Sequence, residues 1–470
     1  MGFRVLKRET RRFIVAENAA SPTVTDQELC DLLEHELICA LGCTEPIAVA
    51  YAAALARRVL GCEPEHMEVG CSGNIIKNVK SVTVPNSQGM RGVESAAVLG
   101  AIGGDAAGAL EVLEGVTDAD VARARELLAV DGYCAVSLVE AVPNLYIEVR
   151  AEALGHVAEV AISEHHTNVV RCTRDGVAVA SMCPAARTGS VQDTCSGTCA
   201  LAQVPPTEPQ QAAGRPGLSL ETILDFVEHG DISAAAPSLE RQVELNRAIS
   251  DEGLANPWGA EVGRTLLATR GGDIACRARA RAAAGSDARM SGCALPVVIV
   301  CGSGNQGITC ALPVITYAEA LGADRERLLR AVALADLVAI HTKSYIGALS
   351  AFCGVVCAAC GAGAAITWMS GGSREQIGAT VVNTLGNVGG IVCDGAKASC
   401  AAKISAAVDA AILGHDMAMA GRGFRAGEGL VQETVEDTIA SMGYVGRVGM
   451  KDTDVEILNI MIGKTDVEAC

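Results

Sequence analysis

The sequence predicts an α+β protein with a mainly helical core of buried Ala/Gly-rich helices and a smaller antiparallel α+β lobe. Half of its 470 residues are hydrophobic, only 3% are aromatic and 51 are glycine. A core of this composition is filled by small side chains, which favours closely packed helices. Strand-like runs occur between residue 65 and about residue 182, and helical character follows from Leu218 to the C-terminus.

Changes in pattern divide the chain into four segments. Residues 1–23 carry charge without a clear period and are interpreted as an N-terminal extension. Residues 24–183 form the predicted α+β region. Residues 184–217 are rich in Pro, Gln and Ser and are interpreted as an excursion between the two regions. Residues 218–470 form the predicted helical region.

Two helices are predicted at the start of the α+β region. Leucines at helical spacing predict the first over residues 26–40, with Thr25 or Asp26 able to cap its start. In the second, Thr44 is able to cap the start, Glu45 and Pro46 suit the first turn, and the run continues to Leu60 with Gly61 as the expected stop. Cys43 therefore precedes a helix N-terminus, where unpaired backbone N–H groups are expected to lower the pKa of its thiol.

Short β-type runs separated by turn residues predict the strands of the lobe. One helix, expected over residues 118–129, interrupts them. The predicted strands cover residues 79–84, 134–139, 145–149, 157–162, 169–172 and 177–179.

A stretch without charged residues runs from residue 344 to residue 372 and is long enough to span a bilayer. Its Ala, Gly, Cys and Ser content, and the lack of basic or aromatic residues clustered at its ends, favour a helix buried at the centre of a large protein. We therefore expect no membrane association.

The acidic composition limits the classes of partner. Acidic residues outnumber basic ones by 55 to 37, which gives a net charge of −18. Nucleic acids and anionic membranes attract basic surfaces, so neither is expected as a main partner. The N-terminus lacks the apolar stretch of a signal peptide, and we expect a cytoplasmic protein. Because that compartment keeps thiols reduced, most of the 20 cysteines are interpreted as small core residues.

Two groups of cysteines are distinguished by their spacing. Cys353, Cys357 and Cys360 form a C-x3-C-x2-C pattern, which on a helix makes one buried stripe. Cys393 and Cys400 flank a turn marked by Asp, Gly and Lys, where thiols can face a metal. One cysteine of the first group together with these two would supply three thiolates, which suits an iron–sulfur cluster better than a closed four-thiolate zinc site. Spacing alone also allows a core stripe with no metal.

Several long, irregular motifs occur in order along residues 24–460. They are GCTEP at 42–46, GNIIKN at 73–78, VTVP at 82–85, HTN at 166–168, SDARM at 286–290, GSGNQGIT at 302–309, LSAFC at 349–353, CDGA at 393–396 with Cys400, and GEG at 427–429. In these motifs the sequence resembles the L-cysteine desulfidase family, relatives of the α subunit of iron–sulfur L-serine dehydratase.

The resemblance implies breakdown of L-cysteine to pyruvate, ammonia and hydrogen sulfide with a 4Fe-4S cluster in place of pyridoxal phosphate. The cluster ligands that it implies are Cys353, Cys393 and Cys400, and Cys43 becomes the catalytic thiol. A permuted assignment, with Cys43 as a ligand and Cys400 not, stays open. An iron without a protein ligand can act as a Lewis acid on the leaving sulfur.

β-Elimination also requires groups that orient an amino acid. Gly-rich segments offer backbone N–H and amide groups to a carboxylate, and an arginine can pair with it. For Arg289 a structural ion pair with Asp287 is an alternative, and for His166 a structural role is an alternative to proton transfer. The candidate substrate-binding residues are Asn74, Lys77, Asn78, His166, Arg289, Ser303, Asn305 and Gln306.

Two other functions fit the same residues. The same cluster can support dehydration of L-serine, because the sequence does not decide the leaving group. The non-enzymatic alternative is a protein that binds cysteine, or responds to redox state, without turning cysteine over. We expect a homodimer. Cys470, at the end of the chain, is hypothesised to occupy the open iron until substrate displaces it.

Overall fold

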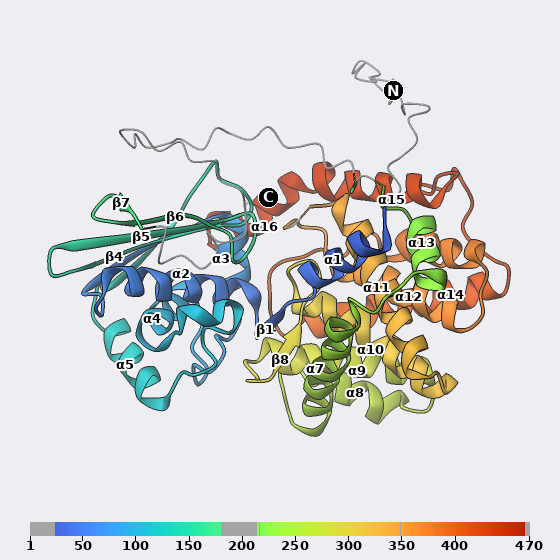
Figure 1. Ribbon diagram of the computed structural model, residues 1–470, viewed down its shortest axis with the longest axis horizontal. Coiled ribbons are helices and arrows are strands. Elements are labelled where there is room, and N and C mark those ends of the chain that lie inside the picture. The colour runs from blue at the N-terminus through green and yellow to red at the C-terminus, as the bar shows by residue number, and fades with distance from the viewer. Residues whose placement is uncertain (1–23, 180–213, 216, 348, 466–470) are drawn as a thin grey trace, which may run out of the picture.

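The structure is a computed structural model that describes residues 24–179, 214–215, 217–347 and 349–465. A sheet-containing region and a mainly helical region lie side by side in it (Figure 1). This arrangement confirms the predicted α+β fold class. The predicted N-terminal extension, nearly all of the 184–217 excursion and the tail with Cys470 lie outside the described residues.

A six-stranded sheet forms one layer of the first region, with strand order β3-β2-β4-β5-β6-β7. The strands are β2 (His66–Cys71), β3 (Cys134–Leu138), β4 (Tyr146–Ala153), β5 (His156–Ser163), β6 (Val169–Arg174) and β7 (Val177–Ala178). β2 and β3 run parallel and the other neighbouring pairs antiparallel, so the lobe predicted as antiparallel contains one parallel pair. Alternate side chains of β4 are buried, and both β4 and β5 pack against α2 (Thr44–Leu60), which lies along one face of the sheet (Figure 1).

The first helix begins where the sequence predicts, whereas α2 begins one residue early, with Cys43 in the N-cap position that the sequence assigns to Thr44. α1 (Asp26–Glu36) starts at a capping box on Thr25 and ends earlier than expected, because the chain continues into β1 (Cys39–Leu41). α2 ends at Gly61, whose φ of 87° favours glycine. α1 lies against the helical region, where it contacts α11 (Arg325–Ser344) (Figure 1). Besides α2, the helices of the sheet-containing region are α3 (Gly73–Val79), α4 (Val93–Gly103), the 3-10 helix η1 (Ala106–Glu111) and α5 (Asp118–Leu128).

The mainly helical region is built around α12 (Val355–Met369), nearly all of whose residues are buried. The uncharged stretch therefore contains a buried central helix, as predicted. None of the helices in the described ranges is long and apolar enough to cross a membrane. The other helices of the region are α6 (Leu220–His229), α7 (Ala236–Ala255), α8 (Val262–Arg270), α9 (Ile274–Met290), α10 (Gly304–Leu321), α11 (Arg325–Ser344), α13 (Arg374–Val388) and α14 (Cys400–Met419).

Two connections join the regions. β1 pairs antiparallel with β8 (Pro296–Val298), which precedes α10. The second connection is a C-terminal arm that runs from the helical region back to α3 (Figure 1). The arm consists of α15 (Val435–Tyr444), the π-helical turn η4 (Val445–Gly449) and α16 (Lys451–Met461).

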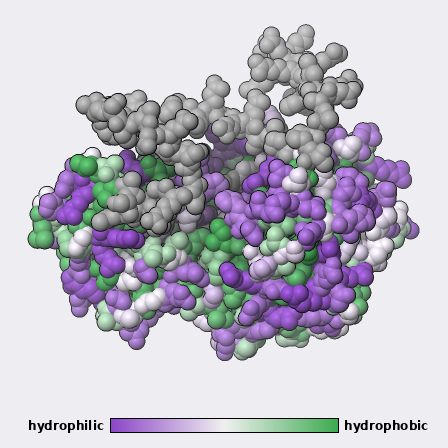
Figure 2. Space-filling model, viewed as in Figure 1, coloured by the Kyte–Doolittle hydropathy of each residue, from purple (hydrophilic) through white to green (hydrophobic). Residues whose placement is uncertain are grey.

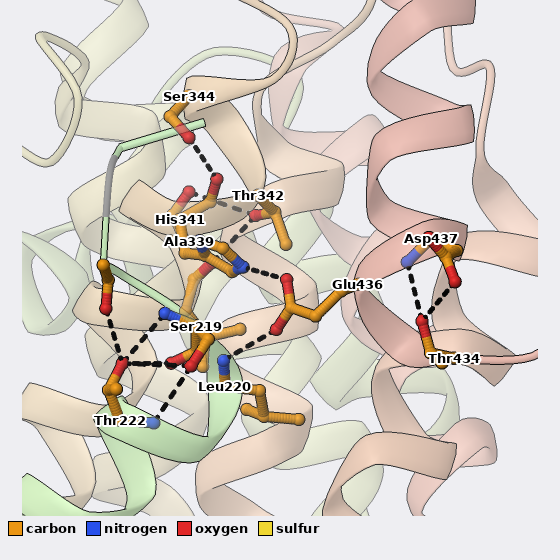
Figure 3. A network of polar contacts seen from close by, with 12 residues as sticks. Ser219, Leu220, Thr222, Ala339, His341, Thr342, Ser344, Thr434, Glu436 and Asp437 are labelled. Atoms are coloured by element: carbon orange, nitrogen blue, oxygen red, sulfur yellow. Dashed lines mark hydrogen bonds and ion pairs between the residues drawn. The ribbon is translucent and has the colours of Figure 1, made fainter. Parts of the chain in front are cut away.

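Glu436 fixes the start of the C-terminal arm to the helical region (Figure 3). Its Oε1 accepts a hydrogen bond from the backbone N–H of Leu220 at 2.8 Å, and its Oε2 lies 2.6 Å from Nε2 of the buried His341. These contacts lower the pKa of the Glu436 carboxyl despite its burial. One carboxylate thus holds α15 against both α6 and α11.

One predicted strand is wrong. Residues 79–84 form no strand, because Val79 ends α3, and the valines that follow it, Val82 and Val84, are buried without joining a sheet. Their β-branched side chains fill packing space between helices instead of alternating across a sheet. β2 and α4 were not predicted. In β2 a single Glu, and in α4 a few Gly and Ser residues, obscure the hydrophobic periodicity of a short element.

Candidate active site

A cleft that opens to solvent is lined by residues of both regions. Figure 2 shows hydrophobic residues gathered where the regions meet, while hydrophilic residues cover much of the helical region. The first region contributes the GCTEP turn and α3. The second contributes the end of α9, the start of α10 and the segments that hold Cys353, Cys393 and Cys400.

Backbone hydrogen bonds hold two of the cysteine segments together. The N–H of Cys353 donates to Ile391 O at 2.9 Å, and the N–H of Cys393 donates to Ala351 O at 2.7 Å. The thiols of Cys353 and Cys393 are hydrogen-bonded to each other. Cys400 is the first residue of α14 and lines the same cleft. Three cysteines from two distant stretches of the chain therefore meet there.

The environment of the three thiols is basic. The hydrogen bond from Cys353 lowers the pKa of Cys393 to about 6, and the ammonium groups of Lys77 and Lys403 add to this effect against the cost of burial. The same hydrogen bond and burial raise the pKa of Cys353, and burial raises that of Cys400. Nearby cations favour the thiolate form that metal binding requires.

A donor set of three thiols suits a 4Fe-4S cluster, because each ligand binds a different iron and the sulfurs need not converge on one point. In the described ranges, no group of three or more His, Cys, Asp or Glu side chains is placed to hold a metal ion. Cys357 and Cys360 are fully buried in α12 and, unlike Cys353, do not line the cleft. The residues present thus fit the cluster with Cys353, Cys393 and Cys400 as ligands.

Cys43 is the N-cap residue of α2 and lines the cleft together with Glu45. Its thiol donates to Glu45 Oε2 at 3.1 Å, and Asn78 Nδ2 donates to Glu45 Oε1 at 3.2 Å. Burial and the neighbouring carboxylate raise the pKa of Cys43 well above its ordinary value. The expected lowering by the helix N-terminus was wrong, because desolvation and Glu45 outweigh the partial charge of the helix.

Arg289, at the end of α9, is 2% exposed and lines the cleft. It makes no hydrogen bond or ion pair with any described residue, and its Nε is buried without a partner. The alternative pairing with Asp287 is absent, because Asp287 accepts hydrogen bonds from backbone N–H groups, including that of Gly263 at 3.1 Å. A buried guanidinium without a counter-charge is expensive unless a ligand supplies one.

Unpartnered polar atoms gather at this cleft. Buried side-chain nitrogen or oxygen atoms without a hydrogen-bond partner occur there on residues from four separate segments of the chain. Such atoms are costly in a folded protein, and their concentration in one cleft is typical of a site that a ligand completes. They are Asn74 Oδ1, His166 Nε2, Arg289 Nε, Asn305 Oδ1 and Gln306 Oε1.

The structure places the remaining predicted residues as follows. Ser303 is the N-cap residue of α10 and lines the cleft. Burial lowers the pKa of His166, which also lines it. Lys77 does not line the cleft, because its ammonium pairs with Asp454 of α16 at 2.5 Å. The predicted direct contact of Lys77 with substrate is therefore not supported, because its ammonium lies outside the cleft.

Several polar residues at or near the cleft were not predicted, among them Glu45, Lys343, Lys403 and Asp454. Glu45 lies inside the GCTEP motif, two residues from Cys43, and its position was the only local signal available. Lys343 and Lys403 line the cleft from helices whose sequences give no sign of it. Asp454 contacts α3 across more than 370 residues of chain, so no local pattern connects them.

A family model described as serine dehydratase alpha chain matches residues 107–459. Similar proteins, each named UPF0597 protein, occur in Lachnoclostridium phytofermentans, Finegoldia magna and Treponema denticola. They are 46%, 46% and 40% identical to this chain, covering 93%, 92% and 93% of it and 99%, 99% and 98% of their own lengths. The chain therefore belongs to the serine dehydratase alpha chain family.

Proposed function

We propose that the protein is an iron–sulfur-dependent L-cysteine desulfidase that converts L-cysteine to pyruvate, ammonia and hydrogen sulfide without pyridoxal phosphate. The observation that carries the proposal is the meeting of three cysteines with the unpaired Arg289 in one cleft. The family supports a lyase of the dehydratase type. The finer assignment to cysteine rests on the motifs and on the placement of Cys43.

Cys353, Cys393 and Cys400 would hold the 4Fe-4S cluster. When bound, it would supply a Lewis acid for the leaving sulfur. The ammonium of Lys403, which pairs with Asp394, lies near the same part of the cleft and offsets part of the negative charge of the thiolates.

Arg289 is the expected partner of the substrate carboxylate. Its guanidinium offers paired N–H donors and forms no ion pair with a described residue. A carboxylate bound there places the Cα of the substrate in the cleft that also holds Cys43. The arginine thus orients the carbon from which a proton has to be removed.

Proton transfer is assigned to Cys43 and Glu45. Cys43 gives its thiol proton to Glu45 Oε2, 3.1 Å away, and the resulting thiolate takes the Cα proton. The C–S bond then breaks, and the electron pair leaves with hydrosulfide, which is released as hydrogen sulfide after protonation. The aminoacrylate tautomerises to an imine, and one water hydrolyses it to pyruvate and ammonia.

Dehydration of L-serine is the second candidate, because the matching family model carries the description serine dehydratase alpha chain. It uses the same residues with hydroxide as the leaving group. Comparing kcat/KM for sulfide release from L-cysteine with that for pyruvate formation from L-serine decides between them. Saturable cysteine binding without pyruvate would instead support a non-catalytic binding protein.

The cofactor is tested with anaerobically purified protein. Cys353→Ala should lose iron, acid-labile sulfide and activity. Cys360→Ala is the matched control, because Cys360 is buried in α12, the helix that begins two residues after Cys353, away from the cleft, and should keep all three. Wild-type protein that contains no iron yet releases sulfide from L-cysteine would overturn the proposal.

We also propose a homodimer, which light scattering of the purified protein tests.

A further inference from the structure

The C-terminal helix α16 contacts α3 through a buried ion pair. Asp454 Oδ1 accepts from Lys77 Nζ at 2.5 Å, and Asp454 Oδ2 accepts from Asn74 Nδ2 at 2.8 Å. The Lys77 side chain is 2% exposed and that of Asp454 is 15% exposed, although α16 has no buried residue. Desolvation makes a buried ion pair a weak source of stability. Its presence on an otherwise peripheral helix indicates a different role.

The carboxylate of Asp454 fixes the amide orientation of Asn74. An ionised carboxylate only accepts hydrogen bonds, so the Nδ2 of Asn74 must face Asp454 and its Oδ1 must face away. Asn74 lines the cleft, and this Oδ1 is buried without a hydrogen-bond partner. If the amide were free to turn, it could present a donor instead. Asp454 therefore selects an acceptor at this point of the cleft.

An acceptor complements the substrate group that Arg289 leaves unbound. An α-amino acid carries a carboxylate and an ammonium, and the ammonium has three N–H donors. Two further amide oxygens of the cleft, Asn305 Oδ1 and Gln306 Oε1, are also buried without partners. Like Asn74 Oδ1, each of them can accept a hydrogen bond from a ligand in the cleft.

We infer that Asp454 is a positioning residue that acts through Asn74 to make the cleft recognise the α-ammonium of its substrate. The inference rests on the proposed function for the reaction that follows binding. The binding of the ammonium itself does not depend on that reaction. Lys77 holds Asp454 in turn, which keeps its carboxylate on Asn74 rather than on the substrate. The protein would therefore discriminate against compounds that carry the carboxylate but lack the ammonium.

The test uses the iron-loaded protein under anaerobic conditions and two ligands that differ only in the ammonium, L-alanine and propionate. Neither has a leaving group, so calorimetry measures binding without turnover. Wild-type protein should bind L-alanine at least about tenfold more tightly than propionate, as expected for charge-assisted hydrogen bonds. Asp454→Asn should weaken L-alanine binding about tenfold and leave propionate binding unchanged, and KM for L-cysteine should rise more than kcat falls.

Three further variants separate this role from a structural one. Asn74→Ala should give the same ligand pattern even if Asp454→Asn does not fold, and Asp454→Glu should restore part of the L-alanine affinity. Lys80→Gln is the matched control, because Lys80 also joins α3 to α16, through the carbonyl of Met461, without touching Asn74. It should leave both affinities unchanged.

Two outcomes would overturn the inference. One is equal weakening of L-alanine and propionate in Asp454→Asn, or a similar loss in Lys80→Gln, since either would mean that α16 only supports the fold. The other is wild-type protein that binds both ligands equally. If the ligand pattern appears but L-cysteine yields no sulfide, the proposed reaction fails and the ammonium site stands.

Discussion

Replacing Arg289 by methionine should sharply lower kcat/KM and at the same time stabilise the folded protein. The guanidinium is buried, faces the cleft and forms no ion pair with a described residue. Its burial therefore costs folding free energy that a bound carboxylate can recover. Methionine keeps much of the side-chain volume and removes the charge.

The magnitudes follow from the hydrogen bonds involved. A paired guanidinium and carboxylate share two charge-assisted hydrogen bonds worth about 1.5 to 3 kcal/mol each, so their loss should reduce kcat/KM by about 100-fold to 10,000-fold. Removing an unsatisfied buried polar group should raise the free energy of unfolding by about 1 to 3 kcal/mol. Thermal denaturation of the substrate-free protein measures the second effect and steady-state kinetics the first.

Arg281→Met on the same helix is the matched control. Arg281 is 14% exposed and pairs with Glu319 at 2.8 Å, so its loss should lower the melting temperature and leave KM unchanged. Iron content of both variants should equal that of wild type. The reasoning is refuted if Arg289→Met melts below wild type to the same extent as Arg281→Met, or if it keeps the wild-type kcat/KM.

Three other predictions concern groups elsewhere in the structure. Glu45→Gln should lower kcat by more than about tenfold without changing iron content, because the thiol of Cys43 loses its proton acceptor; unchanged kcat would exclude the assigned transfer. Burial raises the pKa of Asp336 to about 7. The stability that its neutral form contributes is therefore full below about pH 4 and is lost as pH rises through 7. Asp336→Asn should make the melting temperature depend less on pH between pH 5 and pH 8, and an unaltered pH dependence would contradict this. Gly361→Ala should destabilise the fold, because a Cβ there would lie 2.0 Å from the carbonyl oxygen of Ala335 on α11; a melting temperature equal to wild type would show that the helices separate at no cost.

Local signals were enough to predict the elements that local chemistry determines. Thr25 caps α1 and Gly61 ends α2 because both effects act within one helical turn. The buried position of α12 follows from its own composition, which offers no polar face. For these elements, the residues that carry the sequence signal are the same residues that form the helix or its ends.

Properties that depend on tertiary packing could not be predicted in the same way. The thiol of Cys43 was expected to be acidic from its place before α2, but desolvation and the carboxylate of Glu45 reverse the direction of the pKa shift. Lys77 was expected to contact substrate, but Asp454 reaches it from the other end of the chain. In both cases the deciding group is positioned by the tertiary fold, and a helix or turn pattern carries no information about it.

Two glycines at the cleft leave room for long polar side chains. A Cβ on Gly304 would lie 2.3 Å from Nε of Arg289, and one on Gly354 would lie 2.7 Å from Cδ of Gln306. Neither glycine has a positive φ, so space rather than backbone conformation explains its presence. Long polar side chains can reach the interior of this protein because the opposing helices lack side chains at these points. A core short of aromatic residues and rich in glycine thus provides room for the polar groups that the proposed chemistry requires.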